Sequence, residues 1–70
     1  MSVADLVRMA NQIAANQSYL PPDQASAAVA AHISSFWTPG MRRELVEAVD
    51  NGTAQLNAVA LNAIRQLQPV

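Results

Sequence analysis

Apolar residues recur at the spacing of an α-helix in several segments of the chain, and no segment alternates with the period of two that is typical of a β-strand. Each segment is long enough for a short helix with one apolar side and one polar side. The pattern therefore predicts an all-α protein, a small bundle of three to four short helices in one domain, residues 1–70. The expected helices cover residues 3–15, 23–36, 39–51 and 58–67.

Residues that start and stop helices mark the ends of these segments. Ser2 is expected to cap the first helix, and two prolines in the segment 19–23 interrupt the helical pattern. Thr38, which precedes a proline, is a good helix start because its hydroxyl can accept a hydrogen bond from the first turn. Gly52 supplies a left-handed helix end, and Asn57 is the expected cap of the last helix.

The composition predicts a thin core. The apolar fraction is 51%, but fourteen of these residues are Ala, which favours helices while burying little area. A chain of 70 residues buries a small share of its surface, and the absence of Cys excludes stabilisation by a disulfide. We therefore expect docking to a partner to supply part of the stability, and a homodimer could form when the chain is alone.

The charge balance argues against two classes of partner. Four Arg and five acidic residues give a net charge of −1, which attracts neither nucleic acid nor an anionic membrane surface. The chain also has no Cys and no long apolar run, so we expect a cytoplasmic protein with no membrane contact.

Catalytic chemistry has few candidate residues here. The single His, His32, falls on the predicted apolar side of its helix beside Val29 and Phe36, so a ring that fills a packing gap is favoured over a catalytic or metal-ligand role. The three acidic residues of the helix 39–51 cluster on its predicted solvated side. The sequence therefore predicts no catalytic, cofactor-binding or metal-binding residue in this chain.

Three other features point to contact with a partner. Arg42 falls among apolar positions of its helix. It can extend its charged end to solvent or pair with a carboxylate inside the fold, reach across an interface, or, least favoured, bind a phosphate. Phe36 and Trp37 point about 100° apart, so that one can anchor the core and the other a partner, although two rings that both cover a helix corner are the favoured interpretation. The apolar side of helix 58–67 spans about 200° once Leu61 is included, which is wider than one intramolecular contact needs.

These motifs together resemble the delta subunit of NAD-dependent formate dehydrogenase. The resemblance lies in the segment 5–14, which reads Asp-Leu-Val-Arg-Met-Ala-Asn-Gln-Ile-Ala, in His-Ile at 32–33, in Phe-Trp-x-Pro-x-Met-Arg at 36–42 and in Leu-Asn-Ala at 56–58. It covers nearly the whole chain.

The resemblance implies an accessory protein that aids assembly, stability or cofactor maturation of the cytoplasmic complex that oxidises formate to CO2 and reduces NAD. Its partners would be the other formate dehydrogenase subunits, and these would carry the molybdenum or tungsten pterin, the iron–sulfur clusters and FMN. We expect no cofactor on this chain. The predicted partner-binding residues are Asn11, Gln12, Trp37, Arg42 and Leu61.

Two alternatives come from other classes of protein. The helices 23–36 and 39–51 could form a helix-turn-helix that presents Arg42 and Arg43 to DNA, although the net charge argues against it. An enzyme would need a site assembled around His32 by oligomerisation. Within the leading interpretation, a permanent subunit and a transient assembly factor are both open, because both need the same apolar surfaces.

Overall fold

The computed structural model describes residues 2–67, which form four α-helices and contain no strand. This confirms the predicted all-α class. Each observed helix end lies within one residue of the expected end. The helices are α1 (Val3–Asn16), α2 (Pro22–Phe36), α3 (Pro39–Asp50) and α4 (Ala58–Leu67).

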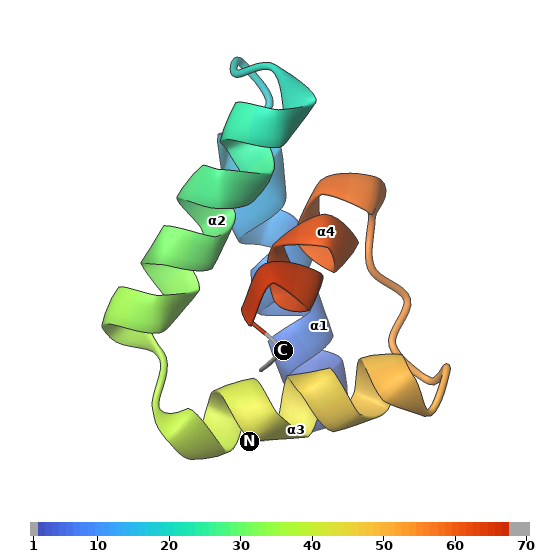
Figure 1. The fold of residues 1–70 in the computed structure, drawn as a ribbon. Coiled ribbons are helices and arrows are strands. Elements are labelled where there is room, and N and C mark those ends of the chain that lie inside the picture. Colours follow the sequence, from blue (N-terminus) through green and yellow to red (C-terminus); the bar gives the residue numbers. More distant parts are fainter. Residues whose placement is uncertain (1, 68–70) are drawn as a thin grey trace.

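The helices pack around α1. Helix α1 contacts each of the other three, and the most extensive helix pair is α2 with α4. In Figure 1, α2 and α4 lie in front of α1, and α3 runs across the lower end of the bundle. Two residues, Trp37 and Thr38, join α2 to α3, so the chain turns sharply between these helices. A longer connection, residues 51–57, leads from α3 to α4.

The helix ends follow the predicted capping residues. At the start of α1, the Asp5 N–H donates to Ser2 Oγ (3.2 Å) and the Ser2 N–H donates to Asp5 Oδ2 (3.3 Å), which completes a capping box. The Thr38 hydroxyl caps α3 by accepting from the Met41 N–H (3.2 Å). Gly52 adopts the left-handed conformation (φ 72°) that glycine tolerates best, just after α3 ends.

A side chain of α1 holds the α3–α4 connection. Asn11 Nδ2 donates to the Gln55 carbonyl oxygen (3.0 Å), and Asn11 Oδ1 accepts from the Asn57 N–H (2.9 Å). Asn57 in turn caps α4, because its Oδ1 accepts from the Ala60 N–H (2.8 Å). Asn11 therefore positions both the connection and the start of α4 relative to α1.

All four helices contribute to the core. A single buried polar side chain among residues 2–67, Ser26, donates from Oγ to the Val59 carbonyl oxygen (3.2 Å) and so links α2 to α4. Within residues 2–67, seven of the thirteen buried hydrophobic residues are Ala, as the composition predicted. The large fully buried hydrophobic side chains are Leu6, Val29, Ile33, Leu45 and Ile64.

The first prediction concerns Asn11. The variant Asn11→Ala loses both hydrogen bonds to the α3–α4 connection, and we expect its free energy of unfolding to fall by about 1–2 kcal/mol, after a small gain from the helix propensity of Ala. Urea unfolding followed by circular dichroism measures the change. The matched control is Gln12→Ala, since the exposed Gln12 side chain bonds only Asn16 on the same helix. Equal stability of the two variants would contradict the role given to Asn11.

The second prediction concerns Asp5. The hydrogen bond from the Ser2 N–H, then the Ser2 hydroxyl and the charge of Arg8, hold the pKa of the Asp5 carboxyl below its usual value. The ionised carboxylate therefore stabilises the folded state above the ordinary Asp pKa of about 3.9, and this contribution is lost as the pH falls through the lower folded pKa.

We expect Asp5→Asn to lose less stability on acidification through this range than the unchanged protein does. Urea unfolding at a series of pH values compares the two proteins. Parallel pH profiles would show that Asp5 does not stabilise the folded state through its charge.

Candidate functional site

An open groove of about 450 Å³ lies where α1, the end of α2 and the start of α3 meet. Helix α1 contributes one wall with the side chains of Arg8, Met9, Gln12 and Ile13. The rest of the lining comes from His32, Phe36, Trp37 and Met41. We call this feature the groove.

The α1 wall of the groove follows from helical spacing. Met9 and Ile13 are four residues apart, as are Arg8 and Gln12, so that an apolar row and a polar row run side by side along the helix. Arg8 Nη2 donates to Asp5 Oδ1 (3.2 Å), which pairs its charge on the surface. The α1 wall therefore combines an apolar row with a polar row.

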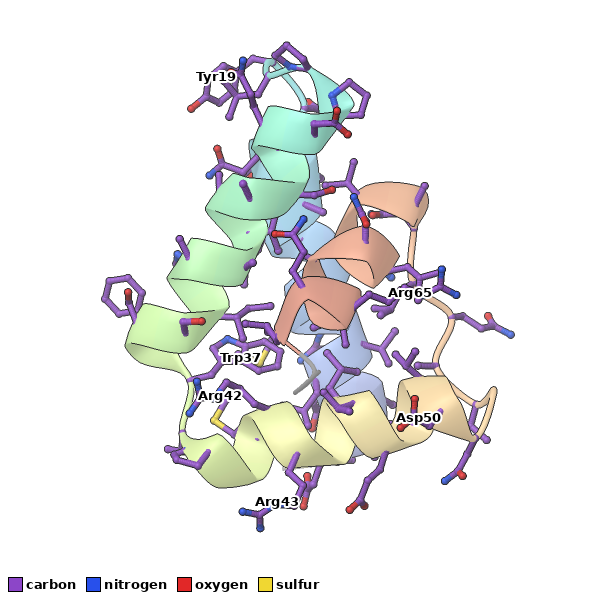
Figure 2. The ribbon with its side chains drawn as sticks, viewed as in Figure 1. Tyr19, Trp37, Arg42, Arg43, Asp50 and Arg65 are labelled. Atoms are coloured by element: carbon purple, nitrogen blue, oxygen red, sulfur yellow. The ribbon has the colours of Figure 1, made fainter. Side chains whose placement is uncertain are left out.

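Phe36 and Trp37 take opposite roles. Trp37 ends α2, donates its backbone N–H to the Ile33 carbonyl oxygen (2.9 Å) and is only 6% exposed. Figure 2 shows the Trp37 ring directed into the bundle. Phe36, the residue before it, is 74% exposed. The chain thus divides this aromatic pair between the core and the surface.

The expectation that His32 fills a packing gap in the core is wrong, and so is the placement of Phe36 on the buried side of α2. Both residues are exposed, and their rings lie against each other with centroids 4.7 Å apart and planes at 40°. His32 lies about 100° around the helix from the buried Ile33. Phe36 lies at the last turn of α2, where Trp37 fills the corner of the core instead.

Arg42 is half-buried in the first turns of α3, directly after the groove residue Met41. Within residues 2–67 its guanidinium has no ion-pair or hydrogen-bond partner. In Figure 2 the Arg42 side chain extends toward the α2–α3 connection, whereas Arg43 extends away from the bundle. Glu44 and Glu47 border a different depression, between α3 and the start of α1. The positive charge of Arg42 is therefore separated from the acidic residues of its own helix.

The five predicted partner-binding residues do not form one site. Gln12 and Trp37 line the groove, and Arg42 lies next in sequence to its lining. Asn11 is half-buried and uses its side chain within the fold. Leu61, on α4, is half-buried and is not among the described side chains that pack against the core. Contact of these residues with a partner stays a prediction.

Sequence reasoning did not select Met9, Ile13, Phe36 and Met41 as site residues, although they supply most of the apolar lining of the groove. The available signal was the adjacent Phe-Trp pair at the end of a helix, since only one of the two rings can face the core. Which of the two rings faces the core depends on how α3 packs against the end of α2, and local sequence does not specify that packing.

Residues 2–67 hold no group of three or more His, Cys, Asp or Glu residues placed to bind a metal ion. None of the helices described is both long and apolar enough to cross a membrane.

The fold and the groove define a class: a small all-helical protein with an open, mainly apolar groove, a type of surface that commonly binds other proteins. The family model of the NADH-dependent formate dehydrogenase delta subunit, FdsD, matches residues 5–64. The chain belongs to this family of delta subunits, which confirms the resemblance seen in the sequence. No curated protein and no solved structure matches the chain.

The third prediction separates the two aromatic residues. Trp37→Ala removes a buried anchor of the core and is expected to lower the free energy of unfolding by about 3–5 kcal/mol, enough to unfold much of a protein this small. Phe36→Ala is expected to change it by less than about 0.5 kcal/mol, because the ring is exposed. Thermal unfolding followed by circular dichroism measures both. Comparable destabilisation by the two substitutions would contradict the assigned roles.

Proposed function

We propose that this delta subunit is a non-catalytic accessory subunit that aids the assembly, stability or cofactor maturation of a cytoplasmic NAD-dependent formate dehydrogenase. The observation that carries the proposal is the family match over residues 5–64, which spans the helical bundle except the first residues of α1 and the last residues of α4. Its partners are then the other subunits of the complex that oxidises formate to CO2 and reduces NAD.

The residues of this chain do not fit the iron–sulfur clusters that we expect in such a complex. Protein iron–sulfur clusters are held mainly by Cys thiolates, and this sequence has no Cys. We therefore assign the iron–sulfur clusters to the partner subunits, together with the molybdenum or tungsten pterin and FMN.

The groove supports a binding role. Phe36 exposes most of its ring, and burying apolar surface of this kind yields roughly 25 cal/mol per Å² removed from water. The bundle itself relies on many small buried side chains, so contact with a larger subunit would also stabilise it. Both subunit and assembly-factor roles use these properties.

The DNA-binding alternative is not favoured by the arrangement of α2 and α3. Arg42 and Arg43 extend in different directions, so that they do not form one basic face (Figure 2). Glu44 and Glu47 follow them on the same helix and are exposed. A net charge of −1 adds no attraction to phosphates.

The fourth prediction tests the proposed function. The large formate dehydrogenase subunits are produced with and without this chain, and each preparation is analysed by size-exclusion chromatography, metal and flavin content, and formate-dependent NAD reduction. Without the chain we expect less assembled enzyme or lower cofactor content per assembled enzyme.

Retention of the chain in the assembled complex would identify a permanent subunit, and improved cofactor content without retention would identify an assembly factor. A chain that is never recovered with the large subunits, and whose omission leaves assembly, cofactor content and activity unchanged, would refute the proposal.

A further inference from the structure

We propose that the groove binds an amphipathic segment of a large formate dehydrogenase subunit that inserts bulky apolar side chains beside Phe36 and places a carboxylate against Arg42. This inference rests on the proposed function and adds to it a binding surface and the chemistry of the segment that it receives.

The size and lining of the groove suit bulky apolar side chains. Its volume of about 450 Å³ exceeds what a single side chain fills, and it is open along one side. Trp37 contributes a nearly buried ring, while Phe36 is exposed beside His32. Met9 and Met41 lie in the lining and, being unbranched, can adjust to the shape of an inserted side chain.

The charges around the groove favour a segment with a carboxylate. No Asp or Glu is among the described residues that line the groove, and the positive charge of Arg8 is already paired with Asp5. Arg42 is half-buried without an ion-pair partner among residues 2–67. A carboxylate from outside would form a charge-assisted hydrogen bond with its guanidinium, whereas a basic segment would be repelled.

A second copy of this chain fits the groove less well. In a two-fold symmetric dimer the same surface faces itself, so the basic residues around one groove would meet those of the other. The residues that line the groove would then offer Arg42 no carboxylate. A separate chain with apolar and acidic residues has no such conflict.

A helical segment is the expected form of the partner. Amphipathic helices bind apolar grooves between helices through side chains spaced three or four residues apart. The groove is bounded by α1 on one side and by the α2–α3 corner on the other. A helical segment could therefore pack against both.

The fifth prediction places a photo-crosslinker in the groove. The substitution Phe36→p-benzoylphenylalanine is introduced into the chain, which is then purified with the large subunits and irradiated. The matched control is Tyr19→p-benzoylphenylalanine, because Tyr19 is similarly exposed (78%) and lies at the opposite end of α2 (Figure 2).

We expect efficient crosslinking from position 36 to one segment of a large subunit with apolar residues at helical spacing and at least one Asp or Glu. Position 19 should give little crosslinking to that segment. Mass spectrometry identifies the crosslinked peptide.

A charge exchange then tests the ion pair. Arg42→Glu is expected to weaken binding of the chain to the large subunits by at least about tenfold, and Arg43→Glu should bind nearly as the unchanged chain does. Replacing the carboxylate of the crosslinked segment with Arg should restore binding of the Arg42→Glu chain. Circular dichroism shows whether each variant is folded. If Arg42→Glu unfolds, the binding measurement uses Arg42→Gln, which removes the charge with less change of shape.

Other results would contradict the inference alone or the proposed function as well. If the unchanged chain binds the large subunits but position 36 crosslinks to a second copy, to a segment without acidic residues, or to nothing, the inference is refuted while the proposed function stands. The same holds if Arg42 and Arg43 variants bind equally well. If the unchanged chain does not bind the large subunits but raises their assembly or cofactor content, the inference is refuted while the proposed function stands. If it neither binds them nor changes their assembly, cofactor content or activity, the proposed function fails and the inference fails with it.

Discussion

The constraint on which this structure depends is a core made largely of small side chains. Seven of the thirteen hydrophobic residues that are buried in the described part of the chain are Ala, so the helices can approach closely but bury little area at each contact. The larger buried side chains come from different helices, and each therefore contributes an unusually large share of the hydrophobic stabilisation. A bundle of this size has a small free energy of unfolding, so loss of one large buried side chain removes a large fraction of it.

Polar side chains fix the relative positions of the helices in a way that contacts between small apolar side chains cannot. Ser26 links α2 to the backbone at Val59, and Asn11 holds the connection that leads into α4. Hydrogen bonds are directional, whereas contacts between Ala side chains tolerate sliding of one helix along another. These two residues thus fix the position of α4 against α2 and α1. Asn11 lies in the segment 5–14 that resembles the delta-subunit family, and this internal role gives a structural reason for an Asn at that position.

The sequence specified local structure well and tertiary structure less well. Helical periodicity and the capping residues Ser2, Thr38 and Asn57 predicted the helices, because these signals act over three or four residues. The hydrogen bonds of Asn11 to the chain more than forty residues away had no local signal. The exposure of His32 could not be predicted either, since a helical wheel gives the direction of a side chain but not how far the neighbouring helices extend.

Residues at the end of α2 both complete the core and line the groove. Trp37 must leave the helix and turn inward to close the core beside α3, and this leaves the preceding Phe36 directed outward. The same turn places Met41 and Arg42 in the first turns of α3 near the groove. Burial in an interface would remove the exposed aromatic ring from water and could supply a partner to a guanidinium that has none among residues 2–67. The local geometry that completes the core thus also generates the surface that a partner subunit would cover.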